Sequence, residues 1–129
     1  MFTYYRVVFS NILIVEDEAI IALDLELKLE NLGYNVVCTV SSGADALRFV
    51  QDNEVDLIFM DIFLRGKLTG VEAAVMIREE FNIPIIYNSA NSDPKTFEMI
   101  KNQEDYEFLV KPFDDVELQK VINRILKFK

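Results

Sequence analysis

Four runs of apolar residues along the chain each end on polar or charged side chains. The most continuous run, residues 55–61, reads Val-Asp-Leu-Ile-Phe-Met-Asp and is too apolar for a strand with one wetted face. Such a run is typical of a strand buried on both faces, as in a parallel sheet covered by helices. The other runs are residues 11–15, 83–87 and 106–110. In open α/β sheets the chemistry lies outside the carboxyl ends of the strands, so the residues that follow these runs are candidates for one site.

Segments with helical spacing separate the apolar runs. Residues 20–32 alternate locally like a strand, but their length and the capping Gly33 favour a helix. Its expected core positions are Ile21, Leu25, Leu29 and Leu32. Leu23 and Leu27 then lie together on a different face of this helix.

The remaining segments complete a regular alternation. Residues 34–40 predict a strand, Ser42 caps the helix that follows, and Thr69 with Glu72 forms a capping box for a helix over 71–81. The core contacts expected from the helix after Ser42 are Ala46, Leu47 and Val50.

The last third of the chain predicts two more helices. A weaker helix begins at Ser92 and runs to about Asn102, with Phe97, Met99 and Ile100 toward the core. Asp114 and Glu117 cap the final helix. Its buried stripe is Leu118, Val121, Ile122 and Ile125.

Five strands alternating with five helices predict an α/β fold, a doubly wound parallel sheet with right-handed crossovers. At 129 residues the chain is one domain. We assign residues 1–10 to an N-terminal lead-in and 11–129 to the domain. Cys38, the one cysteine, is expected to be a small core residue in a reducing compartment, which points to a cytoplasmic protein.

Composition excludes several classes of function. Acids outnumber bases 22 to 13, which argues against direct nucleic-acid binding. No apolar run approaches the roughly 20 residues of a membrane span. Histidine is absent, which excludes imidazole metal sites, a histidine-based catalytic triad and the role of phosphohistidine donor.

The residues at the strand ends carry complementary chemistry. Glu16, Asp17 and Asp61 would form a carboxylate cluster, and such a cluster raises the pKa of at least one member unless a cation compensates. Carboxylates, a main-chain carbonyl and water are the usual environment of Mg²⁺. With Lys111 as a fixed positive charge, this set suits phosphoryl chemistry, in which Asp can be the nucleophile and Ser89 a hydrogen-bond donor.

Taken singly, each of these residues has an ordinary structural explanation. An acidic pair after a strand is often a helix N-terminus stabilised by the macrodipole, and a serine there is usually a cap. The combination of four strand ends in the right order favours the functional interpretation.

Four motifs together resemble the receiver domain of the two-component response-regulator family, from residue 11 to 128. They are Ile-Leu-Ile-Val-Glu-Asp-Glu at 12–18, Asp-Leu-Ile-Phe-Met-Asp-Ile at 56–62, Pro-Ile-Ile-Tyr-Asn-Ser-Ala at 84–90 and Phe-Leu-Val-Lys-Pro-Phe at 108–113. The resemblance implies a flavodoxin-like sheet with strand order 2-1-3-4-5.

The resemblance also implies roles for the residues at the metal site. Asp61 matches the phosphoacceptor, Asp17 a direct Mg²⁺ ligand, and Glu16 a partner that acts mostly through water. The main-chain carbonyl of Phe63 would be a further ligand. The apolar ring of Phe63, two residues after the acceptor, is a departure from the family pattern that bears on the lifetime of the phosphoryl group.

Three more matches concern the response to phosphorylation. Ser89 matches the switch hydroxyl, Lys111 the phosphoryl-binding lysine and Phe108 the switch aromatic, where the family often has threonine and tyrosine as hydroxyl and ring. Glu104 and Asp105 replace the small Gly-Ala pair common before the last strand. This second departure bears on the shape of the switch surface.

The implied function is a signalling module that accepts a phosphoryl group from a sensor histidine kinase or a histidine phosphotransfer protein and acts on an unidentified protein target. It would be a monomer or a weak phosphorylation-dependent dimer, and no enzyme beyond its own Mg²⁺-dependent phosphorylation and dephosphorylation. Leu23 and Leu27 are candidates for the kinase-docking surface. Two alternatives remain open: a hydrolase of small phosphate esters working through an aspartyl phosphate, and a degenerate receiver used only for protein contact.

Overall fold

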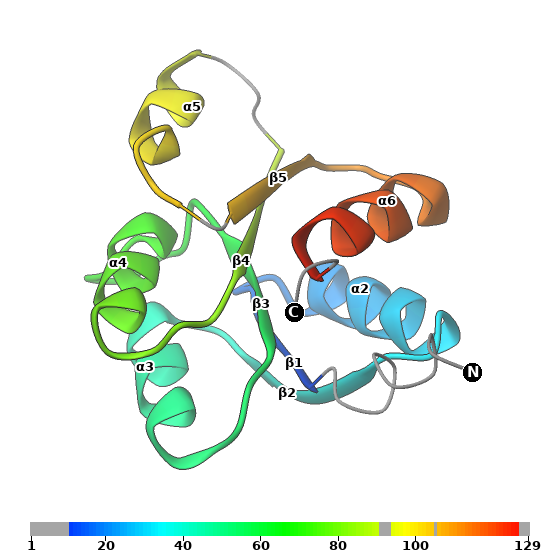
Figure 1. The fold of residues 1–129 in the computed structure, drawn as a ribbon, viewed down its shortest axis with the longest axis horizontal. Coiled ribbons are helices and arrows are strands. Elements are labelled where there is room, and N and C mark those ends of the chain that lie inside the picture. Colours follow the sequence, from blue (N-terminus) through cyan, green and yellow to red (C-terminus); the bar gives the residue numbers. More distant parts are fainter. Residues whose placement is uncertain (1–10, 91–93, 105, 127–129) are drawn as a thin grey trace.

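The computed structural model describes residues 11–90, 94–104 and 106–126 (Figure 1). The strands are β1 (Asn11–Val15), β2 (Asn35–Val40), β3 (Leu57–Asp61), β4 (Ile85–Ser89) and β5 (Tyr106–Val110). The helices are α2 (Ala19–Asn31), α3 (Gly43–Asp52), α4 (Gly70–Glu80), α5 (Pro94–Ile100) and α6 (Asp115–Leu126). The predicted lead-in over residues 1–10, the helix start at Ser92 and Asp105 lie outside the described residues.

All five strands pair in parallel in the order β2-β1-β3-β4-β5, as expected for a doubly wound, flavodoxin-like sheet. Helices α2 and α6 cover one face, while α3 and α4 cover the other, and α5 stands beyond β4 and β5 (Figure 1). The strand order reverses between β1 and β3, so the carboxyl ends of these two strands border the crevice where such folds carry their site.

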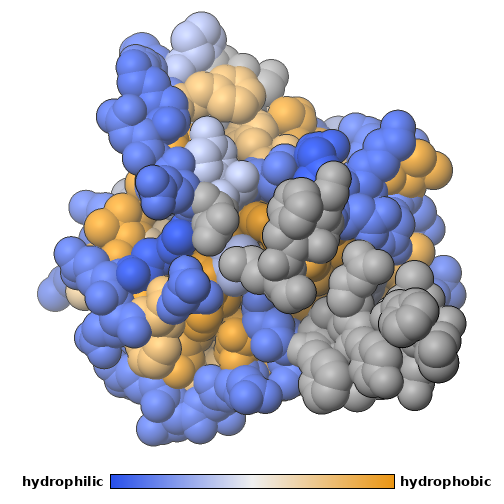
Figure 2. Space-filling model, viewed as in Figure 1, coloured by the Kyte–Doolittle hydropathy of each residue, from blue (hydrophilic) through white to orange (hydrophobic). Residues whose placement is uncertain are grey.

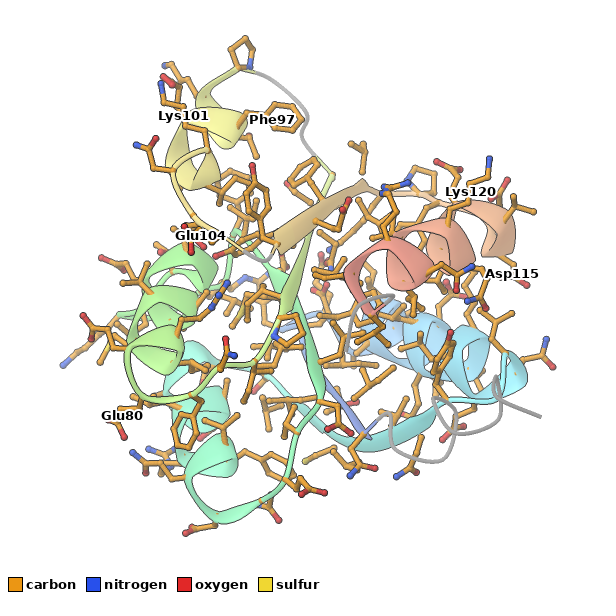
Figure 3. The ribbon with its side chains drawn as sticks, in the orientation of Figure 1. Glu80, Phe97, Lys101, Glu104, Asp115 and Lys120 are labelled. Carbon is orange, nitrogen blue, oxygen red and sulfur yellow. The ribbon has the colours of Figure 1, made fainter. Side chains whose placement is uncertain are left out.

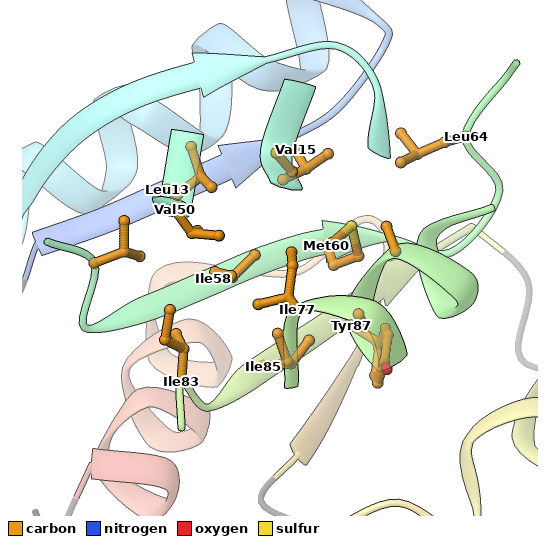
Figure 4. Close-up of a cluster of buried hydrophobic side chains, with 14 of the residues drawn as sticks. Leu13, Val15, Val50, Ile58, Met60, Leu64, Ile77, Ile83, Ile85 and Tyr87 are labelled. Atoms are coloured by element: carbon orange, nitrogen blue, oxygen red, sulfur yellow. The ribbon is translucent and has the colours of Figure 1, made fainter. Parts of the chain in front are cut away.

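Two apolar clusters pack on opposite faces of the sheet because side chains alternate along each strand. The first cluster lies between the sheet and α3 and α4, and Figure 4 shows Leu13, Ile58 and Ile85 within it. The second lies against α2 and α6 and includes Ile12 and Phe59. All residues of β3 are buried, as its continuous apolar sequence predicts.

The predicted capping signals are present. The Ser42 hydroxyl accepts the Asp45 N–H at 3.1 Å, and both bonds of the capping box between Thr69 and Glu72 are formed. Gly33 follows α2 with φ of 98°, a conformation that L side chains rarely adopt. These local signals fix where three of the helices begin or end.

The fourth strand begins and ends two residues later than its apolar run predicts. Asn88 pairs with Asp61 of β3, and Ser89 pairs with Val110 of β5. The backbone ladder continues on both sides, so polar side chains do not end this strand. Ser89 therefore stands on the last rung of β4 and does not follow the strand.

The expectation for α5 is partly wrong. Phe97 and Met99 are 42% and 41% exposed, and the buried positions are Thr96 and Ile100, one helical turn apart. The helix also ends at Ile100, two residues before the predicted end. Figure 2 shows apolar surface over α5, the helix that carries the exposed Phe97.

Smaller differences affect single positions. In α2 the core position next to Leu25 and Leu29 belongs to Ala22, while Ile21 and Leu32 are half-buried. Leu47 is half-buried as well, and in α6 Leu126 is buried where Ile125 is only half-buried. Cys38 is half-buried because β2 is the edge of the sheet. Over the described ranges, no helix combines the length and apolarity that crossing a membrane requires.

Candidate functional site

All four of the predicted strand ends open into one pocket, of about 350 Å³. Its lining comes from β3, β4, the residues after β1 and β5, and the loop after β3, namely Asp17, Glu18, Asp61, Phe63, Arg65, Ser89, Ala90 and Lys111. Glu16 lies behind this lining, in contact with Lys111. The structure thus brings together every residue that the sequence proposes for the metal and phosphoryl site.

Asp61 ends the buried strand β3 and is 5% exposed. Its Oδ1 accepts the N–H of Phe63 at 3.1 Å, and its Oδ2 lies 3.6 Å from the Lys111 ammonium. The start of α4 packs against the backbone of this residue so closely that a Cβ at Gly70 would lie 1.9 Å from the Asp61 carbonyl oxygen. Glycine at position 70 therefore allows the helix to hold the end of β3 in place.

Lys111 bridges two carboxylates. Its Nζ lies 2.7 Å from Glu16 Oε1, and the second oxygen of Glu16 accepts the Glu18 N–H at 3.2 Å. Burial raises the pKa of the Glu16 carboxyl above its usual value of 4.5; the hydrogen bond from Lys111 opposes this shift, and the negative charge of Asp61 adds to it. The direction of this pKa change agrees with the prediction for this cluster, but the largest cause is burial and not the repulsion between carboxylates.

Asp17 is held by the loop after β3. Its Oδ2 accepts the backbone N–H of Arg65 at 3.0 Å and lies 3.7 Å from the Arg65 Nε. Both contacts fall on Oδ2, and Oδ1 makes no hydrogen bond or ion pair with another described residue. One carboxylate oxygen from each of Glu16, Asp17 and Glu18 lies within 4.8 Å of the other two, so Glu18 takes the place that the sequence predicts for Asp61. Asp61 is connected to Glu16 through Lys111. An all-oxygen cluster of this kind suits a hard divalent cation.

Three residues of the pocket lining, Glu18, Arg65 and Ala90, were not proposed as site residues from the sequence. Glu18 directly follows the acidic pair and could have been included by adjacency alone. Arg65 contacts Asp17 across 48 positions of sequence, and its loop carries no pattern that marks the contact.

Ser89 and Phe108 occupy neighbouring strands. Ser89 is 1% exposed, and its carbonyl accepts the Lys111 N–H at 2.8 Å, which ties β4 to the residue after β5. Phe108 is half-buried, and its ring lies 4.8 Å from the ring of Phe97 at an angle of 54°. Figure 3 shows Phe97 projecting from α5 on its inner side. In this conformation the Phe108 ring contacts α5.

Leu23 and Leu27 lie on the solvent side of α2. Their side chains are 54% and 58% exposed, which confirms the predicted helix phase at these two positions. Ile20, one turn before, is 84% exposed and extends the same apolar surface toward the pocket.

Comparison with known proteins identifies the family. The sequence profile of the response regulator receiver domain matches residues 12–123, so the chain belongs to this family. The chain is 39% identical over 121 residues to the response regulator ArlR of Staphylococcus aureus, covering 92% of this chain and 53% of that protein. It is 31% identical over 121 residues to the phyllosphere-induced regulator PhyR of Methylorubrum extorquens, covering 93% of this chain and 45% of that protein.

Solved structures agree with this assignment. The receiver domain of a sensor histidine kinase from Pseudomonas aeruginosa, with a magnesium ion coordinated in its active-site cleft, is 33% identical with a TM-score of 0.81. The match covers 92% of this chain and 98% of that domain. The chain spans about half the length of the response regulators ArlR and PhyR.

Proposed function

We propose that the chain is a phosphorylation-switched receiver domain, formed by residues 11–129, whose acceptor is Asp61. The observation that carries the proposal is the position of Asp61 at the end of the central strand, with one oxygen beside Lys111 in an open pocket shared with Asp17 and Ser89. The Lys111 ammonium is placed to bind the oxygens of an anionic phosphoryl group, and the Asp61 carboxylate is placed to accept that group.

The donor set at the pocket fits Mg²⁺. Asp17, Asp61 and the carbonyl of Phe63 would hold the ion, with Glu16 acting through water. Because both contacts of Asp17 with Arg65 are made by Oδ2, Oδ1 is available to bind the ion. All the donors are oxygens, which Mg²⁺ prefers. When bound, the ion would supply positive charge that neutralises the carboxylates and stabilises the phosphoryl group.

The chain's own residues perform the transfer. A carboxylate oxygen of Asp61 attacks the phosphorus of a phosphohistidine, a P–O bond forms, and the P–N bond breaks with its electron pair returning to the donor imidazole. The Lys111 Nζ lies 3.6 Å from Asp61 Oδ2. It binds a phosphoryl oxygen and stabilises the negative charge that develops on that oxygen. The donor is a sensor histidine kinase or a histidine phosphotransfer protein.

Phosphorylation changes the equilibrium between two arrangements of β4, β5 and α5. The Ser89 hydroxyl moves to donate to a phosphoryl oxygen, and Phe108 turns inward into the space that this movement leaves. That rotation breaks the contact between Phe108 and Phe97, which couples the site to α5. The altered surface acts on a downstream protein and not on nucleic acid or membrane. In this proposal the domain is cytoplasmic, and it is a monomer or a weak phosphorylation-dependent dimer.

The exposed apolar surface of α2 is the proposed docking site for the phosphodonor. Leu23 and Leu27 are exposed one turn apart, and beside them Asp24 pairs with Lys28 at 2.6 Å. A small apolar centre with a charged rim is typical of a transient helix-on-helix contact. Because α2 begins just after Asp17, a partner bound there has its reactive group close to the pocket.

Intact-mass spectrometry after incubation with acetyl phosphate tests the proposal. We expect one acid-labile phosphoryl adduct on the wild type in the presence of Mg²⁺ and none with EDTA. Asp61→Asn should give no adduct, whereas Asp52→Asn, a control at an exposed carboxylate, should behave as the wild type. An equal adduct on Asp61→Asn would place the acceptor elsewhere, and steady turnover of a phosphomonoester would favour a hydrolase.

A further inference from the structure

We infer that the Arg65 guanidinium is a second phosphodonor-binding group of this site, which attracts small dianionic acyl phosphates to Asp61. The inference rests on the proposed function and deepens it. Arg65 lies in the loop after β3 and lines the same pocket as Asp61, Ser89 and Lys111.

The contacts of Arg65 separate a backbone role from a side-chain role. Its backbone N–H donates to Asp17 Oδ2 at 3.0 Å, and this bond does not depend on the side chain. The guanidinium approaches the same oxygen only to 3.7 Å, and the side chain is 81% exposed. An ion pair this exposed contributes little to stability, about 0–1 kcal/mol, so the guanidinium can leave Asp17 at low cost.

The charge at the pocket explains why a second cation matters. The described site has four carboxylates, Glu16, Asp17, Glu18 and Asp61. Besides Arg65 its cation is the half-buried Lys111, which is already paired with Glu16. With a divalent ion and Arg65 the site is neutral, whereas without Arg65 it has one net negative charge. The whole chain has a net charge of −9, so its average field repels an anionic donor.

The geometry favours a donor contact over a purely structural role. The guanidinium is at the open mouth of the pocket, while Lys111 is 15% exposed at its base. A planar guanidinium binds two oxygens of a phosphate together, which a lysine cannot do. Arg65 at the mouth and Lys111 at the base would therefore hold a small dianion from two sides, with its phosphorus toward Asp61.

Arg65→Gln, Arg65→Lys and the control Lys67→Gln test this assignment. Lys67 is an exposed cation in the same loop that does not line the pocket. At saturating Mg²⁺ and low salt, we expect Arg65→Gln to slow phosphorylation by acetyl phosphate five- to tenfold, Arg65→Lys to recover part of the rate, and Lys67→Gln to stay within twofold. The slowing should shrink with added salt and with phosphoramidate, which has less negative charge.

Two measurements that do not depend on turnover complete the test. Mg²⁺ affinity, from calorimetry with the metal alone, should be unchanged or tighter in Arg65→Gln because the backbone bond to Asp17 persists. In NMR spectra of the Mg²⁺-loaded wild type, the Nε–H resonance of Arg65 should shift when the unreactive analogue acetylphosphonate is added.

The outcomes separate this inference from the proposed function. A wild type that acquires no adduct overturns both. A phosphorylated wild type with an equal rate in Arg65→Gln, or with no Arg65 signal change, overturns the role of Arg65 alone. Loss of Mg²⁺ binding in Arg65→Gln also overturns it, since the side chain would then be positioning Asp17.

Discussion

Replacing Lys111 by methionine removes the ammonium between Glu16 and Asp61 while keeping the aliphatic part of the side chain. The Glu16 carboxylate is 3% exposed and 2.7 Å from this ammonium, so the variant leaves a buried charge without its partner. Such a charge is relieved most cheaply when the carboxyl takes up a proton.

The cost of that proton sets the size of the effect. At pH 7, protonating a carboxyl with the ordinary pKa of 4.5 costs up to about 3.4 kcal/mol, at roughly 1.36 kcal/mol per pH unit. This agrees with the ~3–5 kcal/mol typical of breaking a buried ion pair. In the variant, the pKa of Glu16 in the folded state lies above its value in the unfolded chain. The loss of folding free energy is therefore absent below pH 4.5 and grows as the pH rises.

Urea unfolding in EDTA, followed by far-ultraviolet circular dichroism, measures this effect. Lys111→Met should lower the free energy of unfolding by up to about 3 kcal/mol at pH 7 and by up to about 1.4 kcal/mol at pH 5.5; these are upper bounds because the pKa of Glu16 is already raised in the wild type. Lys67→Met, at an exposed lysine, should stay within about 0.5 kcal/mol of the wild type. Adding Glu16→Gln to Lys111→Met should recover part of the loss, because the charge of Glu16 is removed and Asp61 is then the buried carboxylate left without the ammonium.

The pH dependence is the part of this prediction that can refute it. Equal losses at pH 5.5 and pH 7 would mean that Lys111 stabilises the domain by packing and not by pairing with Glu16. A double variant no more stable than Lys111→Met alone would lead to the same conclusion.

Three further predictions concern the proposed switch and its partner. Phe63 lines the pocket and is 51% exposed, and its ring would restrict the attacking water. Phe63→Asn should therefore shorten the lifetime of the phosphoryl group several-fold; a phosphate-release time course that is unchanged or slower contradicts this. Ser89→Ala should still be phosphorylated, but amide exchange in α5 should respond weakly, and a response equal to that of the wild type would reject the coupling. Leu23→Ala with Leu27→Ala should keep the stability and the acetyl phosphate reaction while slowing transfer from the cognate kinase tenfold or more, about 1.4 kcal/mol. Lost stability would mean that the two leucines support the core, and an unchanged transfer rate would place the docking surface elsewhere.

The sheet and the convergence of its strand ends could be predicted because both follow from short-range sequence. Continuous apolar runs mark strands buried on both faces, and parallel strands bring their carboxyl ends to one edge of the sheet. Asp61 and Lys111 are 50 positions apart, yet each directly ends or follows such a run. That these two side chains lie close together could therefore be predicted without knowledge of side-chain packing, and the structure places Lys111 Nζ 3.6 Å from Asp61 Oδ2.

The features that sequence patterns missed depend on tertiary contacts. The phase of α5 could not be read from seven residues, because Phe97 and Thr96 are both plausible core positions until the neighbouring strands are placed. The contact of Arg65 with Asp17 comes from the path of an irregular loop, which has no periodicity to interpret.

Reductive trapping of the phosphorylated domain tests the central claim most directly. Borohydride converts an aspartyl phosphate to homoserine, and peptide mass spectrometry then locates the modified residue in the sequence. After reaction with acetyl phosphate and Mg²⁺, homoserine at position 61 alone is the predicted result. Homoserine at another aspartate, or none in a domain that binds Mg²⁺, would contradict the assignment of Asp61 as the phosphoacceptor.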